Sequence, residues 1–263
     1  MQRITDYGEY VTLVNGVKAE YSNSTLMKDR VNSLIDAGRL YYQKTGNGVL
    51  ILVDEGSYYK GYYHWGDGVF DVEKSDKGIL IEEPDFNARR KEKIQAFEQK
   101  MKNRGFVLLK NSVQLDIVIN ECVEDSGTRA QYLQSRDEYE QVLKLWEEYL
   151  NPMDIALDIK YFFGKEEYRN IIVKDDDRVV STLLGYWNKG KVELHHLVTD
   201  SKYQGKGLAT EVYRYLFKEM QKEKYKRAIA WIADNNIPSL KLHKKLGFKE
   251  NGRTCLQYYL KEE

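Results

Sequence analysis

Two adjacent histidines precede a glycine-rich turn in the second half of the chain. His195 and His196 are two of only four histidines, and they lie in KVELHHLVT, which ends shortly before YQGKGLATEV at 203–212. Imidazole is well suited to exchanging a proton near neutral pH. A turn that opens a helix is suited to binding an anion, because its backbone N–H groups lack helical partners. The pattern predicts a site that binds a phosphate and transfers a proton.

The turn suits a diphosphate without matching the common nucleotide motifs. Gly205 and Gly207 allow the backbone to curl and to approach an anion closely, and the helix that follows directs its positive dipole end toward the turn. The spacing matches neither G-x-x-x-x-G-K-[ST] nor G-x-G-x-x-G, which excludes a P-loop and a Rossmann turn. The turn alone is equally compatible with a plain connection from a strand to a helix.

Alternation along KVELHHLVT predicts which side chains share a face. In a regular strand, residues 193, 195 and 197 lie on one face and residues 194, 196 and 198 lie on the other. Glu193 and His195 are then neighbours, and His196 points away from them, against a helix. The structural alternatives are a solvated Glu193 at the strand start and a hydrogen-bonded core role for His195.

The segments around the turn alternate between helix and strand patterns. Apolar residues at helical spacing predict a helix over 135–150 capped by Ser135, a short helix over 153–163 and a helix from Leu208 onward. Apolar runs predict a hairpin of NIIVKDD and RVVSTLLGYW, then strands KVELHHLVT, AIAWIA and CLQYYL. Asn236 and Gly247 mark the ends of one more helix. This order indicates an α/β (α+β) fold with a mixed sheet and helices on its faces.

Three motifs in order resemble the GCN5-related N-acetyltransferase (GNAT) superfamily over about residues 128–260. They are Gln/Arg-x-x-Gly-x-Gly/Ala after a strand, Asn236-x-x-Ser239 about thirty residues later, and Leu246-Gly247-Phe248 at a helix end. The resemblance implies acetyl-CoA as cosubstrate, with its pyrophosphate at the turn and its pantetheine arm along a strand that splays from its neighbour. The implied cofactor-binding residues are Leu197, Val198, Thr199, Gln204, Gly205, Lys206, Gly207, Leu208, Ala209, Thr210, Asn236 and Ser239.

The same resemblance implies catalytic positions. An amine with a pKa of about 10.4 is almost fully protonated at neutral pH, so its acylation needs a base. Family members place that base eleven or nine residues before the Gln/Arg of the turn, at Glu193 or His195 here. The usual tyrosine acid for the leaving thiolate is replaced by His243, which either donates the proton or packs beside the pantetheine. Tyr258 and Tyr259 are alternative donors.

The first half of the chain resembles the second in its order of elements. We expect a helix over 24–37, a hairpin of GVLILVDEG and SYYKGYYHW, a strand KGILIEE, a helix over 87–103 and a strand GFVLLKN. This predicts two tandem GNAT-like domains, a degenerate one over 1–125 and an acetyltransferase domain over 128–263. In the first, DFNARRK with Arg89 and Arg90 stands in place of YQGKGLA and lacks glycine. The aromatic residues of SYYKGYYHW are expected to pack on a sheet face, with a substrate-contacting wall as the alternative.

Composition bounds the remaining possibilities. Hydrophobic residues make up 42% of 263 residues, which is enough for a sizeable core, and 41 basic residues balance 41 acidic ones. No net field favours nucleic acid or a membrane. Cys122 and Cys255 are expected to be free thiols, no metal site is expected, and the N-terminus lacks a signal-peptide pattern. The sequence therefore predicts a cytoplasmic protein.

We therefore expect an N-acetyltransferase that acts on a primary amine of a small molecule or peptide. Two alternatives remain open. One is an acyl-CoA-binding sensor or interaction module without turnover. The other is a tandem transferase resembling the mycothiol synthase or aminoacyl-tRNA-dependent types.

Overall fold

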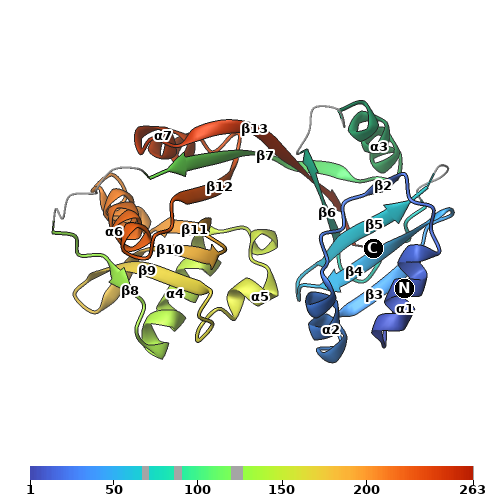
Figure 1. The fold of residues 1–263 in the computed structure, drawn as a ribbon, viewed down its shortest axis with the longest axis horizontal. Coiled ribbons are helices and arrows are strands. Elements are labelled where there is room, and N and C mark those ends of the chain that lie inside the picture. Colours follow the sequence, from blue (N-terminus) through green and yellow to red (C-terminus); the bar gives the residue numbers. More distant parts are fainter. Residues whose placement is uncertain (67–70, 86–90, 120–126, 263) are drawn as a thin grey trace. The chain divides into compact units, whose positions relative to one another are not determined.

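Two units make up the chain (Figure 1). The computed structural model describes residues 1–66, 71–85, 91–119 and 127–262. The N-terminal unit contains Met1–Ser112 and Arg253–Glu263, and the C-terminal unit contains Val113–Gly252. The sequence placed the end of the chain in the second domain, but the last strand crosses between the units, and its part from Arg253 onward belongs to the N-terminal unit, where residues 254–260 pair with a strand. Cys122, Arg89 and Arg90 lie outside the described residues.

The C-terminal unit has the predicted mixed sheet. Its helices are α4 (Arg136–Tyr149), α5 (Leu157–Lys160), α6 (Leu208–Lys222) and α7 (Ile237–Lys245), with short 3-10 turns η2 (Pro152–Asp154) and η3 (Ser201–Tyr203). Its strands follow the order β8 (Gln131–Tyr132), β9 (Tyr168–Asp175), β10 (Arg178–Asn188), β11 (Lys191–Thr199), β12 (Arg227–Ala233) and β7 (Val107–Val118). Only the part of β7 from Val113 onward belongs to this unit. β9 and β10 form the predicted hairpin. The helix expected over 153–163 is instead divided between η2 and α5.

Local signals explain where the two long helices of this unit begin and what they cover. Ser135 caps α4, as predicted, and the structure shows that it forms a capping box with Glu138. Alternate residues of β9 contribute to two cores: Ile171 and Val173 pack beneath α6, and Ile172 packs beneath α4. The sheet therefore separates an α6 side from an α4 side.

The N-terminal unit is built on a similar plan. Its helices are α1 (Tyr7–Asn15), α2 (Lys28–Asp36) and α3 (Lys91–Asn103). Its strands follow the order β1 (Gln2–Arg3), β3 (Leu40–Lys44), β4 (Gly48–Asp54), β5 (Tyr59–Trp65), β6 (Ile79–Asp85) and β13 (Lys249–Leu260), and β2 (Tyr21–Ser22) pairs with β5. Four aromatic residues of SYYKGYYHW are buried in this unit, namely Tyr58, Tyr59, Tyr63 and Trp65. This confirms the expected packing role.

Strand directions change how the two halves correspond. β5 pairs antiparallel with β4 and parallel with β6, as β11 pairs antiparallel with β10 and parallel with β12. The counterpart of β11 is therefore β5, and the counterpart of the glycine turn is the connection over 66–78. DFNARRK follows β6, so its predicted equivalence to YQGKGLA is wrong. The error arose because the β4–β5 hairpin was matched in sequence to the β9–β10 hairpin. The strand that corresponds to β11 is instead identified by its parallel neighbour.

No helix within the described ranges combines the length and the apolar content that crossing a bilayer requires.

Candidate active site

The parallel strands β11 and β12 separate before either of them ends. Their pairing runs from Lys191 opposite Arg227 to Leu194 opposite Ala230, while β11 continues to Thr199 and β12 to Ala233. In the described part of the chain, no other strand pairs with this edge of β11. The edge between residues 195 and 199 is thus open on the β12 side, as predicted from the resemblance.

The glycine turn follows directly from this open edge. Gly205 and Gly207 have φ values of 75° and 84°, a left-handed conformation that favours glycine. A Cβ at either position would meet no atom within 4 Å. Gly207 caps α6 without any side-chain hydrogen bond, so the first N–H groups of α6 face the turn. The Gln204 amide donates to the Thr199 carbonyl oxygen at 3.1 Å and ties the turn to the end of β11.

β11 contains an irregularity at the two histidines. Leu194 of β11 pairs with Gly185 of β10, and the next paired residue of β11, Leu197, pairs with Leu183. β11 therefore has one residue more than β10 between these two pairs. One extra residue in one strand is a β-bulge, and it shifts the alternation of side chains. The bulge therefore lies between Leu194 and Leu197, at His195 and His196.

Both imidazoles lie on the α4 side of the sheet. The His196 ring is edge-on to Trp146 of α4, with centroids 4.7 Å apart. The His195 ring is 6.1 Å from that of His196 and 6.5 Å from Tyr168, which packs in the same core as Trp146. His196 packs against a helix as expected, but its predicted separation from His195 onto the opposite face is wrong because of the bulge.

Glu193 lies in a row of side chains beside His195. It is opposite Tyr186 on β10, which is opposite Tyr168 on β9, and the two tyrosine rings are 4.9 Å apart. Side chains directly opposite each other share a face, so Glu193 is on the α4 side. Its carboxylate forms an ion pair with Lys191 at 2.5 Å. The row combines a partly exposed carboxylate with two aromatic rings, next to the open edge.

The start of α7 lies at the same end of the parallel pair. α6 follows the end of β11 and α7 follows the end of β12, and parallel strands point in the same direction. The Asn236 side chain accepts from the Ser239 N–H at 3.2 Å and caps α7, as predicted. The contacts of Asn236 and Ser239 with a cofactor stay predictions.

His243 is enclosed in the core instead of lining an opening. Its side chain is only 3% exposed, its Nε2 lies 2.5 Å from the hydroxyl of Tyr213 on α6, and its Nδ1 lies 2.8 Å from the carbonyl oxygen of Ser239. Burial lowers the pKa of His243. A neutral ring that donates from Nδ1 and accepts at Nε2 satisfies both contacts, so the ring joins α6 to α7.

The corresponding strands of the N-terminal unit also separate, but their opening is filled. β5 pairs with β6 only from Tyr59 to Gly61. Beyond that point Tyr21 and Ser22 pair with Trp65 and His64. The buried Asn23 side chain donates to the carbonyl oxygens of Gly61 and Glu82 at 3.3 and 2.8 Å, and accepts from the Tyr63 N–H at 2.7 Å. Residues 21–23 thus occupy the edge that is open in β11.

The bulge and the filled opening were missed by sequence analysis. Both depend on the register between strands, and no local motif marks them. The single available signal was the pair His195 and His196 itself, because two adjacent polar residues interrupt an otherwise alternating strand.

Cys255, the free thiol in the described part of the chain, lies outside this site. Burial raises its pKa to about 12, which leaves the thiol protonated and unreactive.

Comparison with known proteins agrees with this geometry. The model of the acetyltransferase (GNAT) family matches residues 130–248. The chain is 32% identical over 95 residues to the SPbeta prophage-derived uncharacterized N-acetyltransferase YokL of Bacillus subtilis, covering 34% of this chain and 52% of that protein. It is 36% identical over 64 residues to the spermine/spermidine N(1)-acetyltransferase of the same species, covering 24% and 42%. The matches thus span about half the length of these relatives, or less.

A solved structure shares the fold over most of the chain. The tandem GNAT protein from the clavulanic acid biosynthesis pathway has a TM-score of 0.52 at 9% identity, with coverage of 83% of this chain and 81% of that one. At this identity the likeness concerns the fold alone. The family match lies within the unit that carries the glycine turn, so it is this unit that is similar in sequence to the GNAT acetyltransferases.

Proposed function

We propose that the C-terminal unit transfers the acetyl group of acetyl-CoA to a primary amine of a small molecule or peptide. The observation that carries the proposal is the open edge of β11, which leads through the short turn η3 into a glycine turn and a helix start that lacks a side-chain cap. An open strand edge offers hydrogen bonds to an amide-bearing chain such as pantetheine. A helix start suits a diphosphate.

The open strand edge, the glycine turn and the start of α7 follow one another along the chain, and each suits a different part of acetyl-CoA. Acetyl-CoA would supply the acyl group as a thioester. We assign its pantetheine arm to the backbone of Leu197, Val198 and Thr199, and its diphosphate to the backbone from Gly205 to Thr210. We assign further contacts to Asn236 and Ser239, because α7 begins at the same end of the parallel pair.

The proton of the amine would pass to Glu193 or His195. Both lie on the α4 side next to the open edge, so an amine bound there could reach either, directly or through a water. The C–N bond forms as the C–S bond breaks, and the sulfur takes up a proton. The burial of His243 and its two internal contacts favour a structural role over the predicted role as acid.

The acceptor class is part of the proposal. The spermine/spermidine acetyltransferase relative makes polyamines the first acceptors to test. The row of Tyr168, Tyr186 and Glu193 supports an amine, since aromatic faces and a carboxylate both attract an ammonium group.

We propose that the N-terminal unit, Met1–Ser112 with Arg253–Glu263, is a degenerate GNAT-like domain that binds no second cofactor. Residues 21–23 already pair with the edge that a pantetheine arm would need. In the described residues between β5 and β6 there is no helix to supply an anion site. One acetyl-CoA per chain is the expected stoichiometry.

Titration calorimetry of acetyl-CoA with the whole chain tests the proposal first. CoA release would then be followed with polyamines, aminoglycosides, amino acids and peptides. One bound acetyl-CoA with release on a particular amine supports the transferase. Binding without release on any of these amines would favour the alternative, an acyl-CoA-binding sensor without turnover. Absence of binding would overturn the assignment of the turn.

A further inference from the structure

The segment that leads into the glycine turn is fastened by the turn of the β9–β10 hairpin. Arg178 forms an ion pair with Asp200, which is 2% exposed. The other oxygen of Asp200 accepts from the Lys202 N–H at 2.9 Å and caps η3. On the opposite side, the Tyr149 hydroxyl accepts from the Ser201 N–H at 3.1 Å. The entry to the turn is thus fixed before Gln204.

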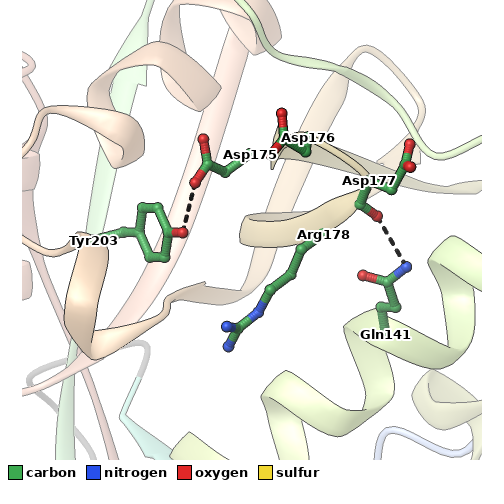
Figure 2. Close-up of a pocket in the computed structure, with 6 residues that line it drawn as sticks. All are labelled: Gln141, Asp175, Asp176, Asp177, Arg178 and Tyr203. Carbon is green, nitrogen blue, oxygen red and sulfur yellow. Dashed lines mark hydrogen bonds between the residues drawn. The ribbon is translucent and has the colours of Figure 1, made fainter.

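Tyr203 extends this fastening to the turn itself. Its hydroxyl donates to Asp175 Oδ2 at 2.6 Å, as Figure 2 shows. The ammonium group of Lys206 lies 4.6 Å from the centroid of the Tyr203 ring. Lys206 stands between the two glycines, so its ammonium position depends on Tyr203, and the Tyr203 position depends on Asp175.

The hairpin turn is held in its own position by α4. Gln141 donates to the Asp177 carbonyl oxygen at 3.2 Å and accepts from the Val179 N–H at 2.8 Å. An open cavity of about 490 Å³ is lined by Gln141 and Asp177 together with Asp175, Asp176, Arg178 and Tyr203 (Figure 2). Three carboxylates against one guanidinium make this cavity a poor site for a phosphate. Its residues support the turn and do not form a second anion site.

We propose that Tyr203 is a positioning residue for acetyl-CoA, which holds Lys206 so that its ammonium group meets the cofactor diphosphate. The proposal rests on the function proposed above. A lysine side chain has a long flexible stem, and ordering it opposes binding. A ring that already holds the ammonium reduces this loss, and the hydrogen bond to Asp175 keeps the ring in place.

The N-terminal unit also contains a tyrosine that donates to an aspartate and carries a lysine over its ring. The Tyr59 hydroxyl donates to Asp76 at 3.3 Å, and Lys77 lies 5.1 Å from the Tyr59 ring centroid. This trio precedes no glycine turn, which makes it an internal control for the loss of a tyrosine hydroxyl or of a lysine charge.

The test measures acetyl-CoA affinity of the full chain for wild type, Tyr203→Leu, Lys206→Met and the double variant. We expect Tyr203→Leu to weaken binding about two- to fivefold, the size of an exposed cation–π contact, and Tyr203→Phe to weaken it less. The double variant should be no weaker than Lys206→Met alone, because Tyr203 acts through Lys206. Tyr59→Phe and Lys77→Met should leave the affinity unchanged.

Kinetics separate positioning from a general loss of structure. The KM for acetyl-CoA should rise in Tyr203→Leu while kcat at saturation stays unchanged, and the salt dependence of binding should fall equally in Tyr203→Leu and Lys206→Met. Additive losses in the double variant, or an unchanged affinity in Tyr203→Leu, would overturn the inference while the proposed function stands. If wild type itself binds no acetyl-CoA, the proposed function fails first.

Discussion

The chain contains two parallel strand pairs that separate in the same way and end differently. β11 leaves β12 after Leu194, and β5 leaves β6 after Gly61. In the C-terminal unit the freed edge leads into a glycine turn and a helix start. In the N-terminal unit the freed edge is paired with residues 21–23 of the chain itself.

The comparison shows that an opening between strands can be filled by the chain itself. Buried backbone N–H and C=O groups must be paired in either unit. Asn23 pairs them in the N-terminal unit, and we propose that acetyl-CoA does so in the C-terminal unit. In the described residues, the two differ in the element that follows the strand, because β11 leads to the start of α6, whereas the described residues between β5 and β6 form no helix.

The largest effect is expected at the turn. Gly205→Glu places a negative charge where the diphosphate would lie, and its Cβ would meet no atom within 4 Å, although the positive φ of 75° disfavours any side chain there. Acetyl-CoA affinity should fall about 100-fold or more, equal to roughly 2.7 kcal/mol. The matched control is Gly56→Glu in the β4–β5 turn, where φ is also positive at 85°. Normal affinity in a folded Gly205→Glu protein would rule out the site.

The next effect concerns the base. His195→Ala or Glu193→Gln should lower kcat about 100-fold, because general bases contribute on that order, while acetyl-CoA affinity is retained. His64 on β5 offers the matched change, since it stands in the corresponding strand of the filled opening. His64→Ala should leave kcat unchanged. If neither C-terminal variant slows the reaction in steady-state assays, both base assignments fail.

A third change addresses the filled opening. Asn23→Ala removes the partners of two carbonyl groups and one N–H group. Leaving such groups unpaired should lower the free energy of unfolding by about 1–3 kcal/mol, measured by denaturant titration. Calorimetry should still find one acetyl-CoA per chain. A second bound equivalent would show that only Asn23 closes the N-terminal site.

The smallest expected effect is a pH dependence of the free energy of unfolding, to which a histidine in each unit contributes. Burial lowers the pKa of His243 in one unit and of His64 in the other. The folded state therefore favours neutral rings, and the unfolded chain takes up protons as the pH falls below about 6.5. The contribution of the two neutral rings to the free energy of unfolding is present above that pH. It is lost below that pH, by at most about 1.4 kcal/mol per pH unit for each ring.

Denaturant titrations at several pH values would measure this loss. His243→Gln should remove part of the slope, and His64→Gln should remove another part. A slope that neither variant changes would assign the acid sensitivity to other groups.

Most features set by neighbouring residues in the chain were predicted correctly, and most features set by the pairing of distant strands were not. Ser135, Asn236 and the apolar stripe of α6 are read within a few residues, and the corresponding helices begin where they were expected. Strand pairing connects distant residues, and there the matching of DFNARRK to YQGKGLA failed. The bulge at His195 and His196 was missed because it is defined by the register with β10.

The sequence by itself determined the GNAT-type order of elements and the glycine turn, because capping, periodicity and glycine spacing are local properties, and the resemblance to the GNAT superfamily implied the two candidate bases. Tertiary structure decided the rest. It put His195 and His196 on the α4 side, buried the His243 ring of α7 against Tyr213 of α6, and filled the β5 edge with residues 21–23. Each of these depends on which strands and helices meet, since a side chain's surroundings are set by its partners across the sheet.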